Sequence, residues 1–127
     1  MRKLAREATF KLIYQSMFIN DDEQSVSLIF EDMEEKDKDF ATNLYQKFKE
    51  NKAEIEKILE ANVKGYEVAR IYKVDVALLY LGITEIKYAT ETPPAVVVNE
   101  IVDIAKRYST DKSYSFINAV MSSILKG

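Results

Sequence analysis

A cation and an aromatic side chain stand one helical turn apart near the end of the sequence, at Lys112 and Phe116. The segment around them predicts a helix whose buried stripe is Ile117, Val120, Met121 and Ile124. Since successive helical residues turn by about 100°, Phe116 lies on the flank of that stripe, on the same side as Lys112. A ring beside an ammonium group can stack a nucleotide base and hold its phosphate. The spacing also fits a phenyl ring that only widens the packed face, and it leaves both interpretations open.

The first turns of the chain carry a second group of cations. Arg2, Lys3, Arg6 and Lys11 accompany a single acid, Glu7, although the protein as a whole has a net charge of −3. Cations at a helix N-terminus oppose the helix dipole, so they indicate a use other than helix stability. We therefore predict an anionic partner whose phosphates are attracted by Arg2, Lys3 and Arg6. The alternative is a solvated start of an amphipathic helix.

The sequence contains neither cysteine nor histidine. This composition excludes disulfides, thiolate or imidazole metal ligands, cysteine nucleophiles and every catalytic arrangement that uses a histidine base. An enzyme would have to work with carboxylates, lysine, tyrosine or serine alone. We predict no catalytic residue, no cofactor, no metal site and no small-molecule substrate.

Composition favours an all-α fold. The 127 residues include only three glycines and two prolines, and 47% are hydrophobic, which is typical of one globular, helix-rich domain. The amino terminus is too polar for a secretory signal, and no apolar run approaches the roughly 20 residues needed to cross a bilayer. We therefore predict a cytoplasmic protein without a membrane partner.

Apolar residues at helical spacing predict a series of helices. They cover the opening segment to Ile19, a stretch from Ser25, a stretch after Asp39, the region of residues 55–59, residues 74–89, a segment beginning at the two prolines, and the last helix. In the opening segment, one apolar face is marked by Leu4, Ala8, Leu12 and Ile19. The helix predicted from Ser25 places inward Val26, Ile29, Phe30 and Met33.

The helix predicted over residues 74–89 differs from the others because it is apolar almost all round between Val76 and Ile83. Such a helix lies at the centre of a fold. Glu85 projects from it, and we expect this carboxylate to be partly buried and hydrogen-bonded to backbone or to a neighbouring helix terminus.

Three ordered segments carry a family resemblance. They are AREATFKLIYQ near the start, RIYKVDVALLYLGITEI in the middle and PPAVVVNEIVDIAKRYSTDKSYSFINAVMSSIL at the end. Together they resemble the NusB family of bacterial transcription antitermination factors, over nearly the full length of the chain. The resemblance implies about seven helices in two small bundles packed side by side, which we place at residues 1–64 and 65–127.

The resemblance also implies a task. The family binds boxA-type single-stranded RNA of nascent ribosomal RNA transcripts together with the small-subunit ribosomal protein NusE. The RNA polymerase antitermination complex then reads through terminators, and no reaction is catalysed. Two alternatives remain: a helical module that only binds other proteins, and the NusB-like domain of an RNA methyltransferase, which would need a further α/β domain for its cofactor.

Family positions fall on particular residues of this chain. RNA binding is implied for Arg2, Lys3, Arg6, Lys112, Ser113 and Phe116. Tyr14 and Asp75 match surface positions that contact the protein partner or the edge of the RNA. The basic N-terminus is shorter than in many relatives, and fewer phosphate contacts predict weaker binding of RNA by this protein alone.

Overall fold

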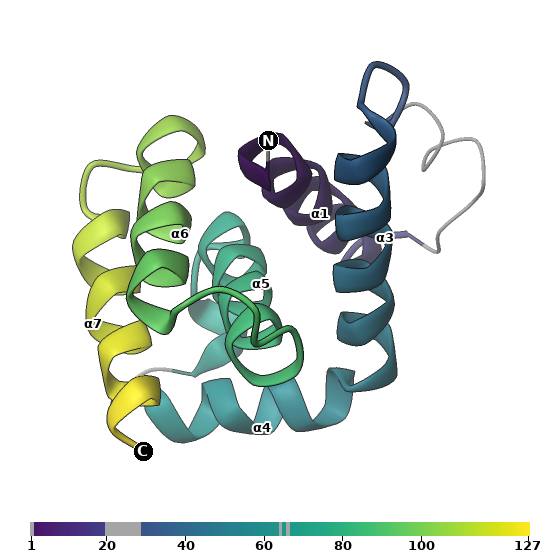
Figure 1. The fold of residues 1–127 in the computed structure, drawn as a ribbon. Helices are drawn as coiled ribbons and strands as arrows, with labels where there is room; N and C mark the ends of the chain where they lie inside the picture. The colour runs from purple at the N-terminus through teal and green to yellow at the C-terminus, as the bar shows by residue number, and fades with distance from the viewer. Residues whose placement is uncertain (1, 20–28, 64, 66) are drawn as a thin grey trace.

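The computed structural model describes residues 2–19, 29–63, 65 and 67–127. In these ranges all regular structure is helical, so the predicted all-α class is confirmed (Figure 1). The elements are α1 (Arg2–Ser16), α3 (Glu35–Glu50), α4 (Lys52–Asn62), a short 3-10 turn η1 (Val68–Arg70), α5 (Lys73–Tyr88), α6 (Pro94–Tyr108) and α7 (Ser113–Lys126). None of the described helices is both long enough and apolar enough to cross a membrane.

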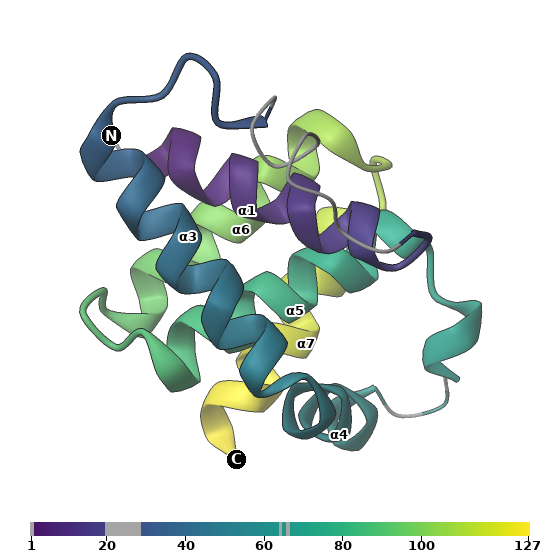
Figure 2. The ribbon, with the colours of Figure 1, turned by 90° about the vertical axis from the view of Figure 1, so that its right-hand side faces the viewer.

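α5 is the central helix, as its all-round apolar sequence predicts. Every residue from Val74 to Glu85 is buried. α6 and α7 lie side by side on one side of α5, α3 lies on the other, and α4 runs across one end (Figure 1). α1 and α3 form a layer in front of α5 and α6 when the molecule is turned by 90° (Figure 2). Because α5 contacts helices from both halves of the chain, it joins them. The division at residue 64 stays a prediction.

The starts of two helices follow from their sequences in different ways. α6 begins at Pro94, with Pro93 as its N-cap, where a missing amide costs no intrahelical hydrogen bond. The prediction that α3 starts after Asp39 was wrong, because the helix begins at Glu35, five residues before Phe40. Acidic residues such as Glu35 and Asp37 in the first turn suit the helix dipole, although they show no apolar periodicity.

The first helix departs from its predicted packing. Ala8 and Leu12 are buried, but Leu4 is 56% exposed and Ile19 is 54% exposed. The helix predicted from Ser25 begins outside the described residues. Three of its residues are described and pack, partly buried, against small side chains of α1 and α3: Ile29, Phe30 and Met33.

Two glycines serve backbone geometry. Gly65, after α4, has a φ of +81°, a conformation that side-chain-bearing residues rarely adopt, and it marks the predicted break. Gly82 lets α7 approach α5, since a Cβ there would lie 2.7 Å from the Met121 Cε atom. The predicted stripe of α7 is confirmed, because Ile117, Val120, Met121 and Ile124 are all buried.

Tyr80 of α5 predicts how stability responds to alkaline pH. Its side chain is 6% exposed. Burial, helped by the charges of Glu56 and Glu60, raises the pKa of Tyr80 to about 12. In the unfolded chain it ionises near pH 10, so from about pH 10 to pH 12 unfolding releases a proton and stability falls as pH rises.

Urea unfolding at a series of pH values tests this. In that window the wild type should lose up to about 2–3 kcal/mol more unfolding free energy than Tyr80→Phe, which cannot ionise. Below pH 9 the two proteins should keep a constant difference. Equal losses in both proteins above pH 10 would contradict the prediction.

Candidate nucleic-acid interface

The structure places two of the predicted N-terminal cations at the surface. The Arg2 guanidinium lies 4.7 Å from the centre of the Phe40 ring, and its Nη2 atom is 2.9 Å from the Glu91 carboxylate. The Lys3 ammonium is 3.0 Å from the Asp103 carboxylate, and its hydrogen bond and charge lower the pKa of Asp103. Exposed pairs of this kind contribute about 0–1 kcal/mol, so phosphates can compete for both cations.

Arg6 lies elsewhere than predicted. Only 4% of it is exposed, and its Nε and Nη2 atoms donate to the two oxygens of Glu85 at 2.7 and 2.6 Å. Burial alone would lower the pKa of Arg6, but the hydrogen bonds and charge of Glu85 outweigh it and raise that pKa. The expectation for Glu85 is corrected as well, because the carboxylate is fully buried and bonded to a side chain of α1. Arg6 therefore joins α1 to α5 and presents no free guanidinium to RNA.

At the start of α7, the predicted residues of α5 and α7 surround one open hollow. Its volume is about 300 Å³, and its lining includes Arg70, Tyr72, Asp75, Lys112, Ser113 and Phe116. Lys112 is exposed, while Phe116 is half-buried and packs against the core. One portion of the Phe116 ring thus packs inward and another borders the hollow, and stacking of a base on the ring stays a prediction. Arg70 and Tyr72, which sequence reasoning missed, add a second cation and a second ring.

Ser113 and Asp75 form a brace below this hollow. Both are about 95% buried. The Ser113 hydroxyl donates to Asp75 Oδ2 at 2.9 Å, and the Ser109 hydroxyl donates to Oδ1 at 2.5 Å. Thr110 adds a hydroxyl contact of 2.8 Å to Ser113. Both side chains are occupied in fixing the α6–α7 turn on α5, and the contacts of Ser113 with RNA and of Asp75 with a partner stay predictions.

Tyr14 lies toward the end of α1. Its ring is half-buried, 6.3 Å from the Phe10 ring and 5.0 Å from the Phe18 ring, measured between centres. Phe18 is 57% exposed. The two outer rings make an aromatic edge at the surface, and contact of Tyr14 with a partner stays a prediction.

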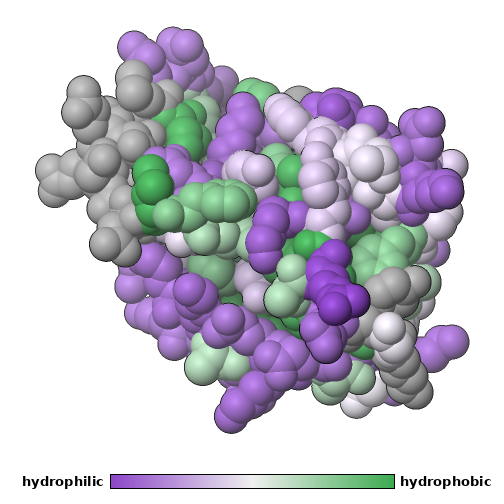
Figure 3. All heavy atoms as spheres, turned by 180° about the vertical axis from the view of Figure 1, so that it is seen from behind, coloured by the Kyte–Doolittle hydropathy of each residue, from purple (hydrophilic) through white to green (hydrophobic). Residues whose placement is uncertain are grey.

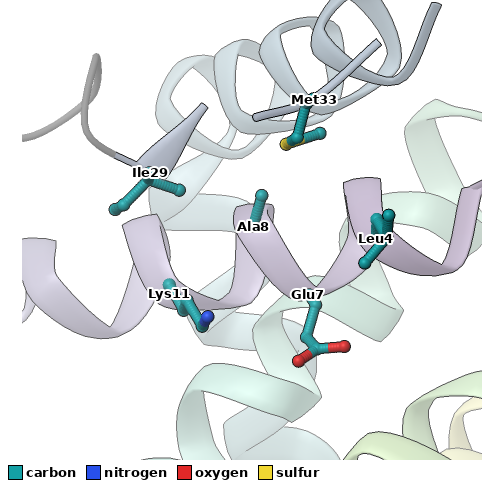
Figure 4. A pocket seen from close by; sticks show the side chains of 6 residues that line it. All are labelled: Leu4, Glu7, Ala8, Lys11, Ile29 and Met33. Atoms are coloured by element: carbon teal, nitrogen blue, oxygen red, sulfur yellow. The ribbon is translucent and has the colours of Figure 1, made fainter. Parts of the chain in front are cut away.

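A second hollow of about 350 Å³ lies beside α1 (Figure 4). Ile29 and Met33 face Ala8 across it, and the exposed Leu4 borders it. Its lining also includes Glu7 and Lys11, but these side chains point away from Ile29 and Met33 (Figure 4). The wall formed by Ile29, Met33 and Ala8 is thus apolar, and the charged groups of Glu7 and Lys11 are directed away from it.

The surface seen from behind shows hydrophobic side chains in separate areas among hydrophilic ones (Figure 3). Within the described residues, no cluster of acidic side chains could hold a metal ion.

Comparison with known proteins gives concordant results. The model of the NusB family matches residues 3–126. A transcription antitermination protein NusB from Finegoldia magna is 37% identical over 128 residues, covering 98% of this chain and 93% of the relative. The protein of the same name from Listeria monocytogenes serotype 4a is 38% identical, covering 97% and 91%.

Solved structures agree with these sequence matches. T. maritima NusB superimposes with a TM-score of 0.91 at 29% identity, covering 99% of this chain and 91% of that one. A chain from a crystal structure of antitermination factors NusB and NusE in complex with dsRNA has a TM-score of 0.88 at 26% identity, covering 98% and 96%.

Proposed function

The chain belongs to the NusB family, and from this we propose that it is a transcription antitermination factor. It binds boxA-type RNA of nascent ribosomal RNA transcripts together with NusE and promotes read-through by RNA polymerase. The task is binding without catalysis, in the cytoplasm, where bacterial transcripts are made. The observation that carries the RNA contact is the exposed Lys112 beside the half-buried Phe116, on the rim of one hollow.

The proposed role of each residue follows from how far its side chain is exposed. Arg2 and Lys3 attract phosphates, and their exposed ion pairs can exchange for RNA. Phe116 stacks an unpaired base while Lys112 holds the adjoining backbone. The buried Arg6 contributes by anchoring α1, so the interface is smaller than the sequence suggested.

Binding of RNA in the presence of NusE tests the function. A boxA-type single strand should bind more tightly than a scrambled strand of the same composition at physiological salt. Equal affinities for the two strands would overturn the proposal, whatever the behaviour of individual variants.

Phe116→Leu tests the stacking role, because leucine keeps much of the apolar bulk that packs on the core. Stacking of one base on an aromatic ring is worth about 1–3 kcal/mol, so affinity should fall roughly 5- to 150-fold. The free energy of unfolding, measured in urea, should change by less than about 1.5 kcal/mol. If Phe116→Leu binds boxA-type RNA as well as the wild type, Phe116 has only a packing role.

A further inference from the structure

Side chains of α1 and α6 meet in a row along the surface. Glu7 accepts from the Arg107 guanidinium at 3.0 Å and from the Tyr108 hydroxyl. The Lys11 ammonium lies 5.8 Å from the centre of the Tyr108 ring. With the Lys3–Asp103 pair, these residues form what we call the α1–α6 seam: Lys3, Glu7, Lys11, Asp103, Arg107 and Tyr108.

The geometry of α1 explains the row. Lys3, Glu7 and Lys11 follow one another at intervals of four residues, so they share one side of the helix. Glu7 and Lys11 point away from the apolar hollow of Ile29 and Met33 (Figure 4). Their contacts with α6 show that this side of α1 faces α6.

Next to the seam residue Arg107, Lys106 of α6 forms a second aromatic–cation pair with Tyr114 of α7. Tyr114 is 40% exposed, and the Lys106 ammonium of α6 lies 5.5 Å from the centre of its ring. An exposed ring with a cation beside it offers stacking for a base and a charge for the adjoining phosphate. Neither residue is among those for which the sequence predicted RNA binding.

Tyr114 and Phe116 flank the buried stripe of α7 on different sides. Residues two positions apart in a helix are separated by about 200° around its axis. Phe116 therefore borders the hollow near α5, while Tyr114 faces α6. Lys112, four residues after the end of the seam at Tyr108, is exposed at the start of α7 on the same side as Phe116. A strand from the seam would reach Tyr114 first, then Lys112 and then Phe116.

The local charge also favours an RNA strand on this path. The seam and Lys106 together contain four cations, Lys3, Lys11, Lys106 and Arg107, against the acids Glu7 and Asp103. On a protein with a net charge of −3, this excess is a local attraction for phosphates. The side chains of Lys3 and Asp103 are 45% and 48% exposed, so this ion pair can exchange with phosphates at small cost. The Arg107 side chain is also 45% exposed, although its partner Glu7 is only 14% exposed.

We propose that one RNA strand crosses the α1–α6 seam between Arg2 and Phe116, and that Tyr114 and Lys106 bind its middle segment as a second stacking platform. This rests on the proposed function and adds to it the path of the RNA and two contact residues. The two candidate surfaces on α1 and α7 are then the ends of one continuous binding site.

The test measures the affinity of the full chain, with NusE present, for fluorescent boxA-type RNA across a range of salt concentrations. Tyr114→Leu should weaken binding about 5- to 150-fold. Lys106→Gln should weaken it several-fold and reduce the slope against salt by about 1, because one phosphate contact is lost. Lys57→Gln is the matched control, since Lys57 lines a different hollow near the C-terminus.

The possible results separate this inference from the function itself. If Tyr114→Leu and Lys106→Gln bind as the wild type does while Phe116→Leu is weakened, RNA does not cross the seam although the protein binds it. If Tyr114→Leu and Lys106→Gln lose affinity for NusE measured without RNA, the stacking platform is overturned as well. If the wild type does not prefer boxA-type to scrambled RNA, the proposed function fails and the path fails with it.

Discussion

Glu85→Ala should lower the free energy of unfolding by about 3–5 kcal/mol, because it leaves the Arg6 guanidinium buried without its partner. Both oxygens of Glu85 accept from Arg6, and the pair is almost completely enclosed between α1 and α5. Urea unfolding at neutral pH measures the loss. The reverse change, Arg6→Ala, should be of similar size, since it strands a buried carboxylate.

Two controls define the cause. Asp103→Ala removes the exposed partner of Lys3 and should leave the free energy of unfolding nearly unchanged. Arg6→Leu combined with Glu85→Leu should be more stable than Glu85→Ala, since no charge is left unpaired. An Arg6→Ala protein that keeps its stability but loses RNA affinity would instead restore Arg6 to the RNA interface.

Asp75→Ala should lower the free energy of unfolding by about 2–3 kcal/mol, because hydrogen bonds to a charged group contribute about 1.5–3 kcal/mol each and are not additive. The variant removes the acceptor of both the Ser109 and the Ser113 hydroxyl. Since this brace fixes the turn that carries Lys112, RNA affinity should fall with stability. Urea unfolding and RNA titration measure the two effects.

Asp75→Asn sharpens this experiment. The asparagine oxygen can still accept one hydroxyl, so its loss of stability should be smaller than that of alanine. Asp111→Ala, at an exposed position of the same turn, should change stability by less than about 0.5 kcal/mol. An Asp75→Ala protein of unchanged stability and reduced NusE affinity would show that Asp75 contacts the partner, as the sequence first suggested.

The helices could be predicted wherever their signals are local. The 3.6-residue period marked α6 and α7, the all-round apolar sequence marked α5, and a proline marked the start of α6. The start of α3 could not be found in this way, because acidic residues at Glu35 and Asp37 stabilise a helix end without marking a buried face. The exposure of Leu4 was missed because its periodicity gave only a face of α1, and whether another element covers it depends on the fold.

Within the candidate site, the sequence by itself determined the pair on α7. Lys112 and Phe116 share one side because four residues make about one helical turn, whatever surrounds the helix. The exposed positions of Arg2 and Lys3 were likewise predictable from a polar start of α1. The chemistry of an aromatic ring beside a cation could therefore be inferred before any tertiary contact was known.

Only the tertiary structure decided which polar side chains are exposed and can contact a partner. Arg6 and Glu85 are 79 positions apart, and Ser113 and Asp75 are 38 apart, so no local pattern joins them. Burial makes a charged or hydroxyl group seek a partner, and the partner is whichever group the packing of α1, α7 and α5 brings within reach. The fold thus withdraws Arg6, Ser113 and Asp75 from the surface, and it assembles the α1–α6 seam from residues that the sequence keeps far apart.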